Sequence, residues 1–255
     1  MEKLSVIIIA KNEEKMISDC IKSVTWADEI LLIDNNSTDK TANLARKLGA
    51  KVLEYKNGSY TEARNYGLKK AKNDWIFYLD ADERCTEELK KEIKEILSAD
   101  RLQDDKVVAY AIPRRNFVLG KELKHGGWYP DYVKRLFMKN KLQKWEGELH
   151  EEPVFDGKMG HLGNPMIHKK KETIPQMVEK TNKWSEIEAK LMFEANHPPM
   201  NIPRFCTAMF REFWFRMIRK MAFLDGSIGI IFAMYQVYSR FISYAKLWEM
   251  QIKTK

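Results

Sequence analysis

Three apolar segments decide the fold: LSVIIIA (4–10), EILLI (29–33) and WIFYL (75–79). Each is a continuous run rich in β-branched or aromatic residues, which is typical of a strand buried on both faces. A further strand is expected at 51–55, and apolar residues at helical spacing fill the intervals between the strands. Strand–helix units repeated in this order predict an α/β fold, in which a mostly parallel sheet carries helices on both faces.

Polar clusters directly follow three of these strands: AKNE (10–13), DNN (34–36) and DAD (80–82). A parallel sheet binds its ligands outside the carboxyl ends of its strands, so we expect the clusters to meet at one edge. Asp80 and Asp82, one residue apart, can share Mg²⁺ or Mn²⁺ with the phosphates of a substrate. Asn12 can also cap a helix that follows the first strand.

The sequence contains neither of the two common glycine-rich phosphate loops. The turn after the first strand reads KNEE (11–14) rather than G-x-G-x-x-G, and no G-x-x-x-x-G-K-[ST] occurs. Asp34 nevertheless ends the second strand, where an acidic residue typically hydrogen-bonds a ribose or a base. Together these features indicate a nucleoside diphosphate held through a metal, as in a nucleotide-sugar.

Composition narrows the class of protein and its partners. The chain has 255 residues, with 44 Lys and Arg against 36 Asp and Glu, and a net charge of +8. This charge favours nucleic acid, phosphate-bearing small molecules or an acidic membrane surface as partner. Three cysteines without a CxxC motif predict neither a disulfide framework nor a zinc site. We expect no signal peptide and no membrane-spanning helix, and therefore a cytoplasmic protein.

Residues 201–255 are expected to form a helical annex to a larger domain over 1–200. Between 205 and 221 apolar residues recur at helical spacing, with Arg and Lys on other faces. Asp225 and Gly226 break this helix, and a second helix rich in aromatic residues follows. A stripe of Met and aromatic residues indicates either internal packing or subunit contact, or a surface that faces a membrane.

Several motifs, taken in order, resemble a known family. SVIIIAKNEE, ADEILLIDNNSTDKT, EARNYGL and WIFYLDADE closely resemble the N-terminal half of family 2 glycosyltransferases, which have the GT-A fold. GGWYPDYVKRLF, LHEEP, FLDGSIG and YAKLWE resemble the bacterial lipopolysaccharide-core glucosyltransferase subgroup. The resemblance spans nearly the whole chain, and it implies a GT-A (Rossmann-like) catalytic domain followed by the helical annex.

The resemblance also implies a role for individual residues. A donor pocket would be lined by Ala10, Asn12, Glu13, Asp34, Arg64, Asn65, Asp80 and Arg135. A Mg²⁺ or Mn²⁺ ion would be held by Asp80, Asp82 and His168, with Asp82 as the more direct ligand. The catalytic base of the family lies in an xED segment, which reads LHE (149–151) here and points to Glu151. Asp131, in GWYPD, is the rival base.

The implied reaction is an inverting transfer of a hexose, with UDP-glucose as the leading donor. The acceptor would be a lipopolysaccharide-core or other cell-envelope glycan, free or lipid-linked. Such an enzyme would lie in the cytoplasm or peripherally on the inner face of the cytoplasmic membrane, with anionic lipid rather than nucleic acid as a further partner. The oligomeric state stays open.

Two alternative functions remain from the residues alone. A sugar-nucleotide nucleotidyltransferase also uses an α/β sheet and Mg²⁺, but it needs a glycine-rich loop where KNEE stands. A basic membrane- or nucleic-acid-binding module without catalysis explains the charge, but it leaves Asp80 and Asp82 without a role.

Overall fold

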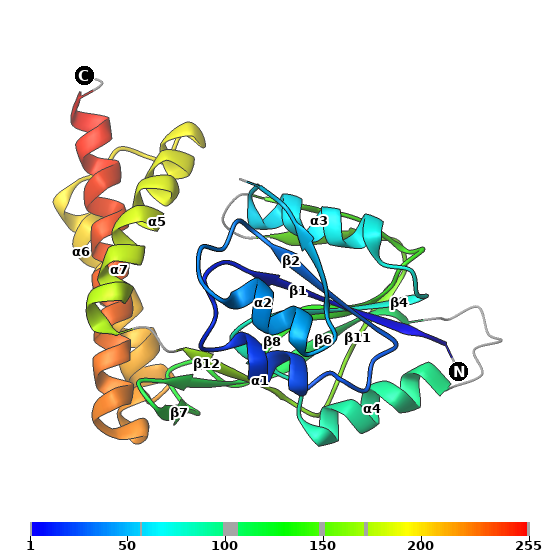
Figure 1. Cartoon of the computed structure of the whole chain (residues 1–255). Coiled ribbons are helices and arrows are strands. Elements are labelled where there is room, and N and C mark those ends of the chain that lie inside the picture. Colours follow the sequence, from blue (N-terminus) through cyan, green and yellow to red (C-terminus); the bar gives the residue numbers. More distant parts are fainter. Residues whose placement is uncertain (1, 57, 99–106, 148–150, 171–172, 254–255) are drawn as a thin grey trace. The chain divides into compact units, whose positions relative to one another are not determined.

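The computed structural model describes residues 2–56, 58–98, 107–147, 151–170 and 173–253, and over these ranges the chain contains a ten-stranded sheet, a two-stranded sheet and a set of helices (Figure 1). The strands of the large sheet are β1 Leu4–Ala10, β2 Glu29–Asp34, β3 Lys51–Glu54, β4 Trp75–Asp80, β5 Glu83–Arg84, β6 Val107–Val118, β7 Lys121–Leu123, β8 Asp131–Met138, β11 Lys158–His161 and β12 Met166–Lys170. They follow the order β3-β2-β1-β4-β8-β6-β12-β5, and β7 and β11 pair with β6. The small sheet pairs β9 Leu142–Glu146 with β10 Glu152–Phe155.

The first four strands form the parallel part of the sheet. β1 runs parallel to β2 and β4, and β2 runs parallel to β3, whereas β8 is antiparallel to β4 and β6. Helices α1 Ile17–Lys22, α2 Thr41–Lys47 and α4 Glu87–Ser98 lie on one face, and α3 Tyr60–Lys70 lies on the other (Figure 1). Right-handed crossovers place α1 and α2 on one face and α3 on the other, because the strand order reverses between β3 and β4. The predicted α/β fold, with a mostly parallel sheet and helices on both faces, is therefore confirmed, and β8 is among the strands that run antiparallel.

The prediction that Asn12 caps the first helix is wrong. Asn12 has a positive φ of 58°, and its Oδ1 accepts the N–H of Thr38 at 2.8 Å. Helix α1 begins only at Ile17, and its N-cap residue, Met16, makes no side-chain hydrogen bond to the helix. An Asn side chain can serve a neighbouring loop as well as a helix end, and here it joins the loops that follow β1 and β2.

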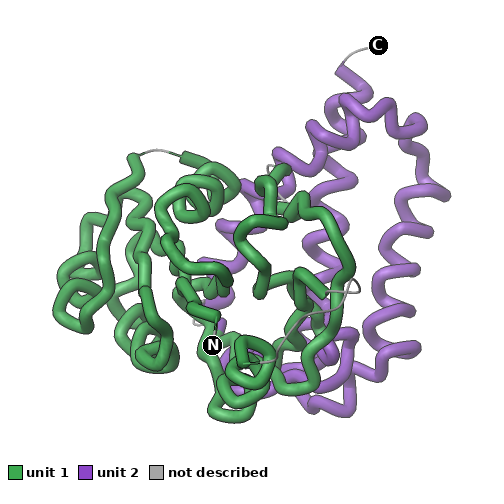
Figure 2. Tube along the Cα trace, turned by 90° about the vertical axis from the view of Figure 1, so that its right-hand side faces the viewer, with its two compact units in different colours: residues 1–115, 131–169 green, residues 116–130, 170–255 purple. Residues whose placement is uncertain are grey.

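The chain divides into two compact units (Figure 2). Unit 1 comprises Met1–Arg115 and Asp131–Lys169, and unit 2 comprises Asn116–Pro130 and Lys170–Lys255. The contacts therefore group residues 170–200 with the C-terminal helices. Division into a catalytic domain over 1–200 and an annex over 201–255 stays a prediction.

Unit 2 is built mainly from helices. They are α5 Ile174–Glu194, α6 Ile202–Phe213, a π-helix η1 Trp214–Arg219, a 3₁₀ helix η2 Ala222–Asp225 and α7 Gly226–Lys253. The second helix, α7, begins at Gly226 as predicted, but the first ends already at Arg219, and Met221 with a φ of 52° turns the chain before Asp225. The α-helix before it, however, ends at Phe213 and continues as a π-helix, which the apolar spacing alone does not reveal.

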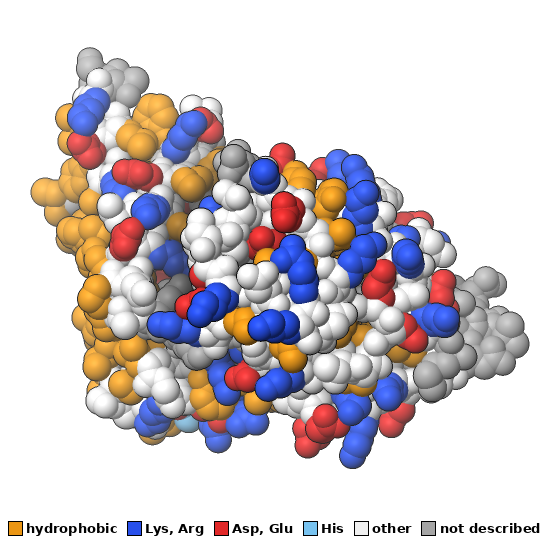
Figure 3. Space-filling view, viewed as in Figure 1, with side chains coloured by type: hydrophobic (Ala, Val, Ile, Leu, Met, Phe, Trp, Pro, Cys, Tyr) orange, Lys and Arg blue, Asp and Glu red, His pale blue; other side chains and the backbone are white. Residues whose placement is uncertain are grey.

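The exposed surface of unit 2 is unusually apolar. Helices α6 and η1 contain no buried residue, and hydrophobic side chains gather over them (Figure 3). Among the described helices, none is by itself long and apolar enough to cross a membrane. Ile202–Arg219 and Ala222–Lys253 together meet these criteria of length and composition, as a pair bent by 61°.

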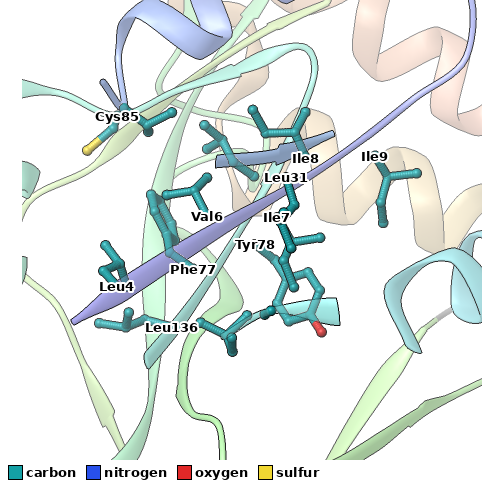
Figure 4. Packing of buried hydrophobic residues seen from close by; sticks show 14 of the residues in the cluster. Leu4, Val6, Ile7, Ile8, Ile9, Leu31, Phe77, Tyr78, Cys85 and Leu136 are labelled. Carbon is teal, nitrogen blue, oxygen red and sulfur yellow. The ribbon is translucent and has the colours of Figure 1, made fainter. Parts of the chain in front are cut away.

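The core of unit 1 surrounds β1 and β4. Val6, Ile7 and Ile8 of β1 are completely buried, and Phe77 and Tyr78 of β4 lie beside them (Figure 4). Burial of each such side chain contributes about 1.5–3 kcal/mol. A close-packed core of this kind holds the strands in one register, and so it fixes the positions of the residues at their carboxyl ends.

Candidate active site

The carboxyl ends of β2, β1 and β4 bring the three polar clusters together, as predicted. Ala10 is paired with Asp34 across β1 and β2, and Ile9 is paired with Asp80 across β1 and β4. The backbone N–H of Asn35 continues this contact by donating to the Ala10 carbonyl at 2.9 Å. The edge of the sheet therefore carries acidic and amide side chains from segments far apart in the sequence.

The loops after β1 and β2 form the first part of the site. Asp34 is only 5 % exposed, and its Oδ1 accepts the N–H of Ser37 at 3.3 Å. The backbone N–H of Glu13 donates to Oγ1 of Thr41 at 2.7 Å. These bonds hold the loops that carry the predicted donor residues Ala10, Asn12, Glu13 and Asp34.

Asn35 is a residue of this region whose importance the sequence did not single out. It is 6 % exposed, and its Nδ2 donates to the Gly58 carbonyl at 3.0 Å. Its Oδ1 is buried, and no described residue donates a hydrogen bond to it. A buried amide oxygen without a partner costs free energy, so this atom can accept an N–H or O–H from a ligand.

Asp80 lies between two arginines. Its Oδ1 accepts Nη2 of Arg64 at 2.9 Å, and its Oδ2 accepts Nη2 of Arg135. Burial alone would raise the pKa of Asp80, but the guanidiniums of Arg135 and Arg64 outweigh it and hold the pKa well below the ordinary value. Desolvation alone would lower the pKa of Arg135, and Asp80 and Glu83 raise it instead. Asp80 is therefore an ionised carboxylate with both oxygens engaged.

Glu83 is a second residue whose importance the sequence does not indicate. It is completely buried, and its Oε1 accepts Arg135 at 2.8 Å and Arg114 at 3.2 Å. Its Oε2 accepts the backbone N–H of Asp80 at 3.0 Å. Arg114 also donates to Oδ2 of Asp131 at 2.7 Å. A largely buried network of three arginines and three carboxylates thus runs from β4 to the start of β8, formed by Arg64, Arg114 and Arg135 with Asp80, Glu83 and Asp131.

Asp82 faces a different partner. Its Oδ2 lies 3.2 Å from Nε2 of His168. His168 is buried, with 7 % of its surface exposed, while the Asp82 side chain is 37 % exposed. Burial would raise the pKa of Asp82, but the hydrogen bond from His168 lowers it below the ordinary value. His168 lies inside β12, opposite Glu83 of β5, so strand pairing brings this histidine to the DAD turn.

The three predicted metal ligands are not gathered into one cluster. Within the described ranges, no group of three or more His, Cys, Asp or Glu side chains converges as a metal site. Asp80 is engaged by arginines, whereas Asp82 and His168 lie together. A carboxylate and an imidazole fit a divalent transition metal whose other ligands come from a diphosphate and water. The role of Asp80 as a direct ligand stays a prediction.

Arg64 and Asn65 point to different surroundings although they are neighbours on α3. The Arg64 guanidinium lies over the ring of Trp145, 4.9 Å from its centroid, and its Nε and Nη1 are buried without a described hydrogen-bond partner. Asn65 instead exchanges two hydrogen bonds with the backbone of Trp145, at 2.9 and 2.7 Å. The predicted donor contact of Asn65 stays a prediction, since its amide already ties α3 to β9.

The two candidate bases differ in their partners. The Oδ2 of Asp131 accepts two N–H groups of Arg114, and its side chain is 27 % exposed. Glu151 is partly buried just before β10, and no hydrogen bond or ion pair joins it to another described residue. Leu149 and His150, which complete the predicted xED-like segment, lie outside the described residues.

Known proteins are similar to this chain in sequence. Residues 5–155 match the profile of glycosyl transferase family 2. An uncharacterized glycosyltransferase of Rickettsia bellii is 30% identical over 99% of this chain and 88% of its own. The lipopolysaccharide core biosynthesis glycosyltransferase LpsC of Rhizobium meliloti is 26% identical over 96% of this chain and 92% of its own.

Two solved structures share the fold. The mannosyltransferase PcManGT of Pyrobaculum calidifontis, solved with GDP-Man and Mn²⁺, has a TM-score of 0.58 at 12% identity and covers 97% of this chain and 88% of its own. S. aureus TarS, solved with UDP-GlcNAc, has a TM-score of 0.51 at 16% identity, and the match covers 99% of this chain and 92% of the TarS chain. Fold and motifs together define a glycosyltransferase with the GT-A fold. The chain belongs to glycosyl transferase family 2.

Proposed function

We propose that this chain transfers a hexose, with inversion, from a UDP-sugar to a cell-envelope glycan such as the lipopolysaccharide core, and that glucose is the sugar. The observation that carries the proposal is that Asp34, Asp80 and Asp82 lie at the carboxyl ends of β2 and β4, the two strands that flank β1, next to buried arginines. Similarity to LpsC supports the acceptor class. Membership of a glycosyltransferase family leaves no support for the nucleotidyltransferase and the non-catalytic module.

The nucleoside would bind at the ends of β1 and β2. Asp34 supplies a buried carboxylate, and Asn35 supplies an amide oxygen without a described partner. A nucleobase and ribose offer N–H and O–H donors to such acceptors. Ala10, Asn12 and Glu13 would line the same pocket through the loop that follows β1.

The diphosphate would lie against the DAD turn. Arg64 keeps two buried nitrogens without a described hydrogen-bond partner, so its charge suits phosphate oxygens. Asp82 and His168 would hold a Mn²⁺ or Mg²⁺ ion. Such an ion would neutralise the negative charge that develops on the leaving diphosphate. Asp80 and Glu83 orient Arg64 and Arg135, so that the cationic groups are fixed before the substrate arrives.

Glu151 is the favoured base for the acceptor hydroxyl. An oxygen of Asp131 already accepts two N–H groups from Arg114 and is therefore less available for a proton, while Glu151 has no ionic partner among the described residues. The base removes the proton of the acceptor hydroxyl as the acceptor oxygen attacks the anomeric carbon from the side opposite the diphosphate. The bond between the anomeric carbon and the diphosphate oxygen breaks, the nucleoside diphosphate leaves, and the configuration is inverted.

A thermal-shift panel of UDP-, GDP- and dTDP-sugars, with and without Mn²⁺, tests the donor. Ligand at about 100 times its Kd contributes about 2.7 kcal/mol, which corresponds to a Tm increase of roughly 5–10 °C for a chain of this size. We expect UDP-glucose with Mn²⁺ to give the largest increase. Equal or larger shifts with GDP- or dTDP-sugars would overturn the choice of UDP, and NMR of the product anomer tests inversion.

The predicted cytoplasmic location, with peripheral attachment to the membrane, is also part of our proposal. A lipid-linked acceptor would be reached at that surface. Fractionation of cells that produce the full chain, before and after a salt wash, tests this: recovery only in the soluble fraction would contradict it.

A further inference from the structure

Unit 2 contains a hollow that the proposed sugar transfer does not use. It has a volume of about 470 Å³ and lies along α6, η1 and α7. Three arginines and several aromatic residues line it, among them Phe210, Arg211, Trp214, Arg219, Arg240 and Tyr244. We call this hollow the arginine groove.

The arginine groove carries excess positive charge. Its carboxylate, Glu212, is shared by Arg216 at 2.9 Å and Arg240 at 3.7 Å. Arg211 and Arg219 are exposed, and neither makes a hydrogen bond or ion pair with a described residue. Two guanidiniums that line one hollow without a counter-ion favour an anion with several oxygens, such as a phosphate.

An apolar stripe borders the same groove. Phe210 and Trp214 are 61 % and 51 % exposed, and their rings stack with centroids 6.0 Å apart. Ile218 and Met221 continue the stripe at 43 % and 44 % exposure. Exposed apolar patches of this extent mark interaction surfaces rather than ordinary protein surface (Figure 3).

The charge of the chain is concentrated in the same region. Residues 201–255 contain nine Lys and Arg against three Asp and Glu, a net charge of +6, while the whole chain has +8. A nucleic acid would match the charge but not the exposed aliphatic side chains. A phospholipid with an anionic headgroup matches both, because it joins phosphate oxygens to acyl chains.

We propose that the arginine groove binds the phosphate headgroup of an anionic phospholipid, and that the stripe of Phe210, Trp214 and Ile218 enters the interfacial layer of the bilayer. Arg211 and Arg219 hold the phosphate, and the aromatic rings lie at the boundary between headgroups and acyl chains, where Trp side chains are stable. This site does not depend on the identity of the sugar donor.

Binding to vesicles tests the arginines. The full chain is sedimented with vesicles of phosphatidylcholine alone, or of phosphatidylcholine and phosphatidylglycerol in equal parts. A double variant, Arg211→Gln with Arg219→Gln, is expected to bind the anionic vesicles roughly 30-fold more weakly, from about 1 kcal/mol per cation. The matched control is Lys183→Gln with Lys190→Gln, which removes two exposed cations from α5 of the same unit. Equal losses in both double variants would overturn a specific groove.

Tryptophan fluorescence tests the apolar stripe. Brominated phosphatidylglycerol quenches a Trp that enters the bilayer, so Trp214→Phe should remove most of the quenching. Trp184→Phe, which changes another exposed Trp of unit 2 at 46 % exposure, should leave it nearly unchanged. Undiminished quenching in Trp214→Phe overturns the insertion of this stripe. Displacement from the vesicles by glycerol phosphate at concentrations comparable to the lipid overturns the choice of a bilayer lipid in favour of a soluble phosphate.

Discussion

Unit 1 and unit 2 differ in which side chains they bury and which they expose. Unit 1 buries charges: Glu83 is completely buried, and Arg64 and Arg135 are 4 % and 5 % exposed. Unit 2 exposes apolar residues instead, and its helix α6 has no buried residue. The contrast separates two kinds of recognition. Paired buried charges fix a few atoms in place for a specific ligand, while exposed apolar residues favour a broad partner surface.

The largest expected effect tests whether the acidic edge of unit 1 serves chemistry. Asp82→Asn should lower turnover of the sugar donor by about 10³-fold or more, since several kcal/mol of transition-state stabilisation depend on the metal site. Stability should change little, because the Asp82 side chain is 37 % exposed. Steady-state kinetics with Mn²⁺ measure this. Glu54→Gln, at the exposed end of β3, is the control. Unchanged turnover in Asp82→Asn would remove Asp82 from the site.

The next effect compares the two units directly. Glu83→Gln removes the completely buried carboxylate that Arg114 and Arg135 share, which leaves them only Asp131 and Asp80, and it should cost about 3 kcal/mol of unfolding free energy. Glu212→Gln in unit 2 also removes the partner of two arginines, but at 16 % side-chain exposure in a surface groove it should cost about 1 kcal/mol or less. Urea unfolding measures both. Equal costs would break the contrast between the units.

A smaller effect separates structure from donor binding at Asn65. Asn65→Ala removes two hydrogen bonds to the Trp145 backbone and should cost about 1–3 kcal/mol. Asn65→Asp keeps the acceptor for the Trp145 N–H, so it should cost less. Neither variant should raise KM for the donor if the residue only ties α3 to β9. A KM increase with unchanged stability would restore the predicted donor contact.

The smallest effect depends on pH. Burial would raise the pKa of Asp39, but hydrogen bonds from Thr41 and Glu14 lower it below its ordinary value of 3.8. A carboxylate with a lowered folded pKa adds stability that is present above its unfolded pKa and is lost as the pH falls through the folded value. Asp39→Asn should therefore be less stable than the unaltered chain at pH 7, by at most about 1 kcal/mol for this partly exposed group.

Urea unfolding across the range from pH 7 to pH 3 checks this. The difference between the two proteins should shrink as the pH falls below about 4. A difference that stays constant over the whole range would mean that the Asp39 charge is not involved.

The strand ends could be predicted from the sequence, because an apolar run that stops at an Asp reports both the strand and its end. The parallel order then brought Asp34 and Asp80 to one edge. The partners of Asp80 could not be predicted. Arg64 and Arg135 are 16 and 55 residues away in the sequence, and only the folded sheet brings both to one carboxylate.

Other features were hidden because one local pattern fits two structures. Asn12 has the residue type of a helix cap, yet a positive φ turns its side chain to Thr38. The apolar spacing through Trp214 fits an α-helix and a π-helix equally well over so short a segment. The burial of Glu83 could not be predicted, since nothing in the sequence indicates that β5 and β12 pair beside it.

The division of unit 2 into two stretches of chain has a consequence for protein synthesis. Val118 and Leu123, from the first stretch, belong to the same buried cluster as Phe232 near the C-terminus. All four parallel strands, β1 to β4, have been synthesised once the chain reaches residue 80, so that part of the sheet can form early. Residues 116–130 must wait for α7. A chain terminated after residue 200 would leave them with an exposed apolar surface, and quality-control proteases and chaperones recognise such surfaces.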